Sequence, residues 1–105
     1  MNLSSGLASA TQHADPNGGL PKNIAAYSTS KTAVNAWTIF LAAELKDTPI
    51  KVNAGDPGWV KTDLGGPDAR LTIGESIPSL VRVIEAQHGR GGLQYLDYRG
   101  ETVAW

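Results

Sequence analysis

Strand patterns alternate with helix patterns along this chain, and that order allows few folds. Residues 1–4 resemble the end of a strand, and residues 50–54 and 93–96 have the composition of two further short strands. Apolar residues at helical spacing predict one helix over 24–46 and a second over 73–87. The order strand, helix, strand, helix, strand is typical of a parallel sheet, where right-handed crossovers place helices on both faces. We therefore predict an α/β fold with about three strands and two helices, half of a Rossmann-like doubly wound sheet.

The connecting segments carry loop and capping signals. Residues 6–23 are rich in Ala, Gly, Pro, Asn and Asp, which predicts a long loop. Thr72, followed three residues later by Glu75, forms a capping-box pattern at the start of the second helix. Pro78 is expected to kink or fray that helix, and Gly55 is expected to loosen the structure around it.

Composition excludes several classes of function. The 105 residues are 41% hydrophobic, which suffices for the modest core of one domain. The chain has no cysteine, which excludes a disulfide scaffold and a thiolate metal site and is compatible with a reducing compartment. Its net charge of −1 is spread along the chain, so we expect no nucleic acid and no membrane as partner. We expect a soluble, cytoplasmic protein that binds a small molecule or another protein.

Histidine and tryptophan carry no predicted chemistry here. His13 and His88 lack partners at metal-ligand spacing, so we expect solvated loop residues and no metal. The three tryptophans are expected to pack in the core or against the ligand side of a loop: Trp37, Trp59 and Trp105.

Tyr27 and Lys31 form the first candidate for chemistry. Residues four apart stack on one face of a helix, so the phenol and the ammonium group are expected to lie close together. A nearby cation favours the phenolate, which would let Tyr27 exchange a proton with a carbonyl or alcohol oxygen. The alternative is a chance pairing, because short spacings such as this one recur by accident.

Two further candidates follow strands, at the sheet edge where open parallel sheets bind ligands. Ser4 and Ser5 end the first strand, and a hydroxyl there could orient a carbonyl. Residues 56–62 follow the second strand, and the Pro and Gly of this loop would leave the backbone of Val60 and the hydroxyl of Thr62 free for a polar planar group. The alternatives are a simple Ser-Gly turn and an ordinary strand-to-helix loop.

Together the three segments resemble the short-chain dehydrogenase/reductase family, classical type, and the chain's ending is similar to that of its carbonyl-reductase-like branch. The resemblance covers essentially the whole chain and identifies residues 1–105 as the C-terminal, catalytic half of such a domain. The glycine-rich phosphate turn and the Asn-Asn-Ala-Gly motif of the family are absent. The resemblance implies a nicotinamide-dependent oxidoreductase that reduces a carbonyl or oxidises an alcohol, with NADP favoured over NAD.

The resemblance also implies a role for each candidate residue. Tyr27 would be the general acid/base, Lys31 would hold the nicotinamide ribose hydroxyls, and Ser5, in preference to Ser4, would position the substrate oxygen. The remaining cofactor contacts would come from the loop after the second strand: Pro57, Gly58, Val60 and Thr62. The cofactor itself would carry the hydride.

Two alternatives stay open. One is a truncated, non-catalytic remnant that acts, if at all, through protein association, and the exposed edge of a half sheet would favour self-association. The other is an extended-type relative such as a sugar-nucleotide epimerase, which shares the tyrosine–lysine spacing but lacks the loop at 57–62. Ser5 and Tyr27 lie 22 positions apart, so the segment 6–23 holds an insertion that would shape the substrate pocket or block a helix–helix dimer contact.

Overall fold

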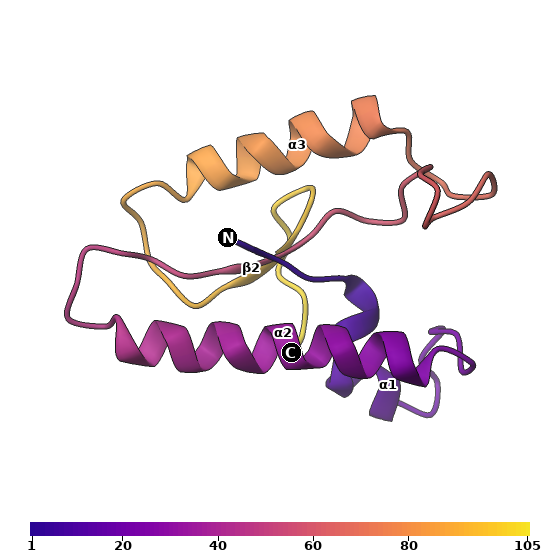
Figure 1. Cartoon of the computed structure of the whole chain (residues 1–105), viewed down its shortest axis with the longest axis horizontal. Helices are drawn as coiled ribbons and strands as arrows, with labels where there is room; N and C mark the ends of the chain where they lie inside the picture. Colours follow the sequence, from indigo (N-terminus) through magenta and orange to yellow (C-terminus); the bar gives the residue numbers. More distant parts are fainter.

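The sheet is parallel and three-stranded. The computed structural model describes all 105 residues, with strands β1 (Asn2–Leu3), β2 (Ala54–Asp56) and β3 (Tyr95–Asp97) side by side in that order. Helix α2 (Ala25–Glu44) connects β1 to β2, and helix α3 (Ile73–Ala86) connects β2 to β3. Figure 1 shows the two helices on opposite sides of β2. The predicted order of elements and the Rossmann-like half sheet are therefore confirmed.

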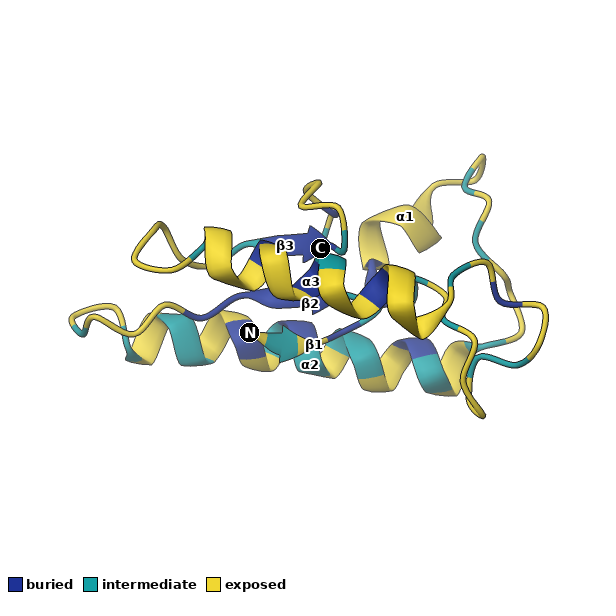
Figure 2. Ribbon diagram, turned by 90° about the horizontal axis from the view of Figure 1, so that it is seen from above, coloured by how far each residue is buried: buried dark blue, intermediate teal, exposed yellow.

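The two crossovers have opposite hands. Both carry the chain in the same direction across the sheet, from β1 to β2 and from β2 to β3. Their helices nevertheless cover different faces, since α3 lies over β2 in the view from above and α2 lies below the sheet in Figure 1 (Figure 2). Two right-handed crossovers in this order would place both helices on one face. One crossover is therefore left-handed, and the expectation that both are right-handed is wrong.

Strand β2 lies further along the chain than its composition predicts. The β-branched residues predict a strand at 50–54, but the ladder extends through Gly55 and Asp56. Backbone hydrogen bonds to the neighbouring strands do begin earlier, where the carbonyl of Val52 accepts from Leu93 N–H at 2.8 Å. The Met1 side chain and Leu80 of α3 pack against Gly55 in the space that a Cβ would occupy.

The segment predicted as one long loop contains two short helices. A 3₁₀ turn, η1 (Gly6–Ala8), is followed by helix α1 (Ala10–Ala14). The hydroxyls of Ser5 and Ser9 cap their first turns by accepting hydrogen bonds from backbone N–H groups at 3.2 Å. The first half of the segment 6–23 is therefore ordered by capping, and the expectation of an uninterrupted loop is wrong.

Helix α3 begins in the predicted capping box. The Thr72 hydroxyl accepts from the N–H of Glu75 at 3.3 Å, and the Glu75 carboxylate accepts from the N–H of Thr72 at 2.7 Å. That backbone N–H also lowers the pKa of the Glu75 carboxyl. The helix continues through Pro78 from Ile73 to Ala86, so the expected fraying is absent.

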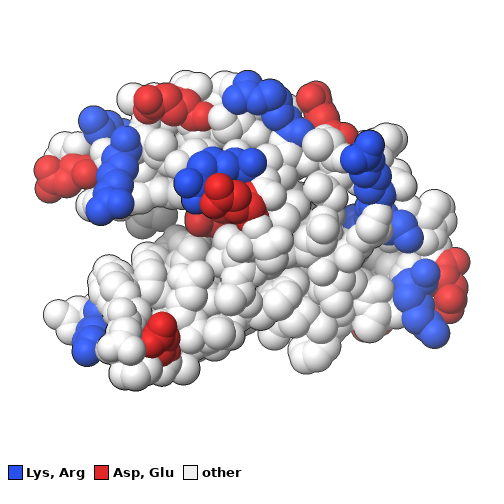
Figure 3. Space-filling model, turned by 180° about the vertical axis from the view of Figure 1, so that it is seen from behind, with Lys and Arg blue, Asp and Glu red and all other residues white.

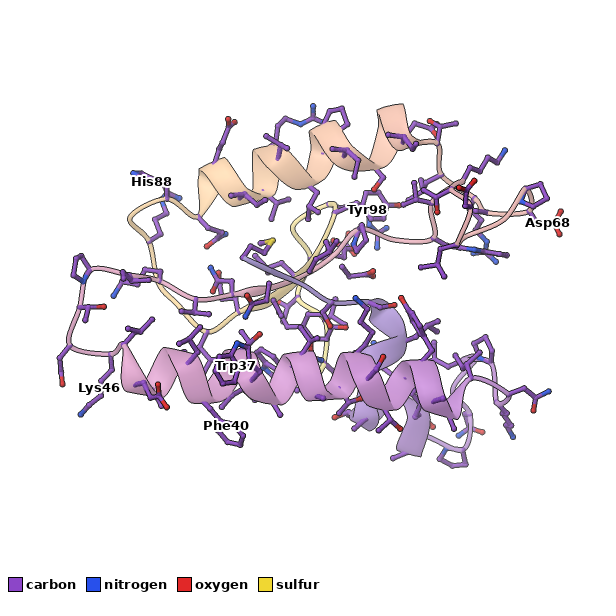
Figure 4. All side chains as sticks on the ribbon, viewed as in Figure 1. Trp37, Phe40, Lys46, Asp68, His88 and Tyr98 are labelled. Carbon is purple, nitrogen blue, oxygen red and sulfur yellow. The ribbon has the colours of Figure 1, made fainter.

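The core is thin, since only 18 of the 105 residues are buried. Its centre is formed by Ala54, Tyr95 and Val103, with Trp105 packed on the Tyr95 ring at 5.3 Å between centroids. Trp37 is 58% exposed on α2, contrary to the expectation that it is buried, and Phe40 of the same helix points away from the sheet (Figure 4). Much apolar surface is therefore uncovered in this chain.

Charges of both signs are mixed over the surface. On the face shown in Figure 3, Lys and Arg side chains alternate with Asp and Glu. The densest ion-pair group is the one in which Arg99 contacts Asp97 at 2.9 Å and Glu101 at 2.7 Å. No helix is both long enough and apolar enough to cross a membrane.

Candidate active site

Ser5 follows the carboxyl end of β1, the loop 57–62 follows that of β2, and Lys31 of α2 contacts the end of β1. These two strands are parallel neighbours, so their ends share one edge of the sheet. The ends also touch, because a Cβ placed on Gly6 would lie 2.9 Å from Oδ2 of Asp56. Figure 3 shows the surface hollowed at this edge, between the loop that follows β2 and the segment formed by α1 and the start of α2.

The backbone of Ser5 is hydrogen-bonded to Tyr95, a residue of β3. Tyr95 is only 1% exposed, and its hydroxyl donates to the backbone carbonyl of Ser5. Burial raises the pKa of the Tyr95 phenol, and the negative charges of Asp56 and Tyr27 raise it further. The phenol is therefore a neutral donor, and both Tyr27 and Asp56 lie within electrostatic reach of the group that fixes Ser5.

The two serines at the end of β1 differ in their surroundings. Ser4 is 2% exposed, and its hydroxyl donates to Oδ1 of Asn35 on α2 at 2.6 Å. Ser5 is half-buried, and its oxygen accepts from the N–H of Leu7 at 3.2 Å. The Ser5 hydroxyl proton is thus available to a ligand, whereas the proton of Ser4 is used within the protein.

Tyr27 and Lys31 occupy the first turns of α2, four residues apart and both half-buried. The Lys31 ammonium group donates to the carbonyl of Leu3 at 3.2 Å. The N–H groups of Asn2 and Ser4 bond to β2, so the alternate residue Leu3 directs its carbonyl toward the free edge of β1. Lys31 therefore links α2 to the end of β1.

Helix α1 is anchored against the start of α2. The Nε2 atom of His13 lies 3.0 Å from the carbonyl oxygen of Leu7 and 3.3 Å from the hydroxyl of Ser28, the residue after Tyr27. The Thr32 hydroxyl donates to the carbonyl of Ala8 at 2.9 Å. His13 is exposed, as expected, but it lies in a helix and ties the insertion to the helix that carries Tyr27. The structure contains no group of three or more His, Asp or Glu side chains arranged for a metal ion.

The loop after β2 is held by one hydrogen bond within the loop and one to α3. Gly58 has a φ of +77°, and its N–H donates to Oδ1 of Asp56 at 2.9 Å. The carbonyl of Pro57 accepts from the buried hydroxyl of Ser76 on α3 at 2.6 Å. A Cβ on Gly58 would lie 2.7 Å from the Leu71 side chain, so both the backbone conformation and the packing favour glycine here.

Val60 and Thr62 stand in different situations within this loop. Val60 pairs with Leu71 in an isolated parallel bridge whose hydrogen bonds come from the residues on either side of Val60. Its own N–H and carbonyl therefore point away from Leu71. The Thr62 hydroxyl accepts from the N–H of Gly65 at 3.0 Å and donates over 3.4 Å to the Val60 carbonyl, so it is already in use within the loop.

Sequence reasoning did not assign a role to three residues at this edge: Asn35, Asp56 and Tyr95. Asn35 follows Lys31 by four positions, and that spacing places it on the Tyr27–Lys31 face of the helix. Asp56 directly precedes Pro57, at the last position of β2. Tyr95 had no local signal, because its role depends on the pairing of β3 beside β2.

Comparisons with known proteins show the family and support the fold. Residues 18–70 match the family model described as short chain dehydrogenase. The structure superposes on a short-chain dehydrogenase/reductase from Burkholderia multivorans with bound NADP at a TM-score of 0.85 and 47% identity, covering 98% of this chain and 42% of that one. It superposes on the carbonyl reductase Sniffer of D. melanogaster at a TM-score of 0.77 and 36% identity, covering 98% of this chain and 39% of that one.

Two curated proteins extend the comparison. The C-signal protein of Myxococcus xanthus is 35% identical over 80 residues, which are 76% of this chain and 48% of that protein. The (+)-neomenthol dehydrogenase of Capsicum annuum is 32% identical over 94 residues, which are 89% of this chain and 29% of that protein. The chain thus spans less than half the length of these relatives.

Proposed function

Because the chain belongs to the short chain dehydrogenase family, we propose that it forms the catalytic half of an NAD(P)-dependent oxidoreductase. The reaction is hydride transfer that reduces a carbonyl or, in reverse, oxidises an alcohol. The observations that support this proposal are the shared edge of β1 and β2, the close approach of Asp56 to Gly6 and the hydrogen bond from Lys31 of α2 to Leu3 at the end of β1. NADP is favoured over NAD because NADP is bound in the B. multivorans relative.

The residues present fit the nicotinamide end of such a cofactor. Lys31 has three N–H donors and uses one on Leu3, which leaves two for ribose hydroxyls or a phenolate. The backbone of Val60 points away from its bridge partner and can meet a carboxamide. Thr62 would exchange its 3.4 Å contact for the same carboxamide, and Pro57 with Gly58 would line the ring.

The proposed chemistry assigns one task to each catalytic side chain. A bound nicotinamide supplies or accepts the hydride. In reduction, the Tyr27 hydroxyl gives its proton to the substrate oxygen, and in oxidation the phenolate takes that proton back. The Lys31 ammonium stabilises the negative charge left on Tyr27, and the Ser5 hydroxyl donates a hydrogen bond to the same substrate oxygen.

We also propose that the chain associates with a second copy through the free edge of β1. Leu3 is 55% exposed, and its carbonyl is directed away from β2. Apart from the contact between Lys31 and the Leu3 carbonyl, no strand pairs with this edge, and such an edge favours pairing with another chain. The proposal also places the chain in the cytoplasm, because a protein without cysteine fits a reducing compartment.

The test is a fluorescence titration of the chain with NADPH and NADH, combined with an assay of carbonyl reduction. We expect saturable NADPH binding, and turnover that falls by about 10²-fold or more in Tyr27→Phe, since general acid–base catalysis contributes that much. Tyr98→Phe, a tyrosine of the turn after β3, is the matched control and should keep its turnover. Turnover unchanged in Tyr27→Phe would refute the assigned role, and no binding at millimolar cofactor would favour the non-catalytic remnant.

A further inference from the structure

Asp56 places a carboxylate beside the proposed catalytic serine. It is the last residue of β2 and is half-buried. Its Oδ1 accepts the N–H of Gly58 at 2.9 Å, so this oxygen shapes the loop. Its Oδ2 faces Gly6, the residue after Ser5, at 2.9 Å from the position of a Cβ. One oxygen of Asp56 is therefore structural, and the other is directed at the end of β1.

The charge of Asp56 has no ion-pair partner in the protein. The three ion pairs are formed by Lys46 with Asp47 and by Arg99 with Asp97 and Glu101, all outside this edge. The charge of Asp56 also acts on Tyr95. After burial, which has the larger effect, the charge of Asp56 contributes to raising the pKa of Tyr95, the phenol that bonds the Ser5 carbonyl. No Lys or Arg side chain of the protein therefore pairs with the carboxylate that lies beside Gly6.

Such a group discriminates between substrates. An ionised carboxylate only accepts hydrogen bonds, so Oδ2 can bind an O–H or N–H group and repels another anion. Gly6 directly follows Ser5, so a substrate whose oxygen bonds to Ser5 and Tyr27 would carry its α substituent, two bonds from the carbonyl carbon, within reach of Asp56.

We infer that Asp56 is a specificity-determining residue that selects carbonyl substrates with a hydrogen-bond donor or a cation on the α carbon, such as α-amino and α-hydroxy ketones, and disfavours 2-oxo acids. This inference rests on the proposed function, because it assumes that the carbonyl lies at Ser5 and Tyr27. An unpaired charge at about 4 Å in a partly buried site gives a preference of about tenfold for the cation.

The test uses three phenyl ketones whose α groups differ in charge: phenacylamine carries an ammonium group on the α carbon, acetophenone has a neutral methyl group and benzoylformate has a carboxylate at that position. Each is titrated into the ¹⁵N-labelled 105-residue chain near pH 6, and the amide signals of Gly6 and Gly58 are followed by NMR. We expect phenacylamine to bind about tenfold more tightly than acetophenone, and benzoylformate to bind most weakly.

Asp56→Asn removes the charge and keeps an oxygen that can accept from Gly58, so the loop should retain its shape. In this variant the spread among the three ketones should shrink to about threefold or less. Asp63→Asn is the matched control, because Asp63 is an exposed carboxylate further along the same loop. Amide signals away from this edge report whether each variant keeps its fold.

Each other outcome refutes the inference. Equal affinities for the three ketones, or a preference unchanged in Asp56→Asn, would show that Asp56 does not select the substrate. An equal loss in Asp63→Asn would indicate a general charge effect. If no ketone shifts Gly6 or Gly58, this edge does not take the carbonyl and the inference fails. The NADPH titration with Tyr27→Phe is read independently and decides the proposed function by itself.

Discussion

Helices α2 and α3 cover opposite faces of one sheet, yet they bury opposite kinds of side chain. The buried residues of α2 are all polar: Ser28, Asn35 and Thr38. Those of α3 are mainly apolar: Leu80 and Val83, together with Ser76. The amphipathic pattern expected of a surface helix is thus present in α3 and nearly reversed in α2, where Trp37 and Phe40 are exposed.

The difference shows that the two faces serve different purposes. Three side-chain hydrogen bonds join α2 to the end of β1: from Asn2 to Thr38 at 2.9 Å, from Ser4 to Asn35 at 2.6 Å and from Lys31 to the carbonyl of Leu3 at 3.2 Å. Hydrogen bonds are directional, so they fix how the helix that carries Tyr27 lies along β1. Apolar burial is non-directional and roughly proportional to area, which suits the supporting face under α3. We conclude that the contacts of α2 mainly fix its position on β1, whereas those of α3 mainly stabilise the sheet.

The largest effect is expected on the α3 face. Leu80 is 6% exposed and packs over Gly55 of β2, so Leu80→Ala should lower the free energy of unfolding by about 3 kcal/mol through lost burial and a cavity. Urea denaturation followed by circular dichroism measures this loss. Ile77→Ala, on the same helix but 44% exposed, is the control and should cost much less. Equal losses in the two variants would show that α3 does not support the sheet as described.

The second effect tests the α2 face. Asn35→Ala leaves the buried Ser4 hydroxyl without its acceptor, which should cost about 1–2 kcal/mol. The cost stays below that of Leu80 because Nδ2 of Asn35 already lacks a partner, so its removal relieves one unfavourable burial.

A double-mutant cycle with Ser4→Ala isolates this hydrogen bond. We expect a coupling energy of about 1 kcal/mol between Ser4 and Asn35, measured by urea denaturation of the four proteins. Strictly additive losses would mean that the bond contributes nothing to stability. The conclusion that hydrogen bonds position α2 on β1 would then be wrong.

The two faces also differ in how far the sequence reveals them. The capping box at Thr72 and the apolar spacing of α3 are local signals, and both predicted the structure correctly. The span of α2 was predicted as well, but its polar interior was not, since Asn35 and Thr38 are buried only because β1 presents Asn2 and Ser4 to them. The motif residues Ser5, Tyr27 and Lys31 could be singled out from the sequence, whereas Asp56 and Tyr95 required the pairing of three strands.

The third effect concerns the start of the supporting helix. Thr72→Ala removes the hydroxyl that accepts from Glu75 and should cost about 1 kcal/mol. Helix α2 has no side-chain cap at Ile24, so Thr29→Ala in its exposed first turns serves as the control and should change stability little. A loss in Thr29→Ala as large as that in Thr72→Ala would mean that the two helices do not differ in capping. Differences in urea midpoint at a constant slope provide the measurement.

The smallest effect is a pH dependence confined to the α3 side. The turn after β3 packs on α3, since a Cβ on Gly100 would lie 3.6 Å from the Val83 side chain. Burial alone would raise the pKa of Asp97, but hydrogen bonds from the N–H of Glu101 and from the side chain and N–H of Arg99 hold that pKa below its ordinary value. The ionised carboxylate therefore stabilises the fold above the unfolded-state pKa of about 4.

This stabilisation should disappear as the pH falls through the lowered pKa of Asp97, because protonation then costs the turn its acceptor. The urea midpoint of the wild-type chain should decrease between about pH 4 and pH 2, and Asp97→Asn should flatten that decrease. Asp68→Asn, at the exposed loop tip in Figure 4, should follow the wild type. The hydrogen bond between Ser4 and Asn35 joins neutral groups, so the cost of Asn35→Ala should be the same at both ends of this pH range. A cost that varied with pH would show that this contact also depends on charge.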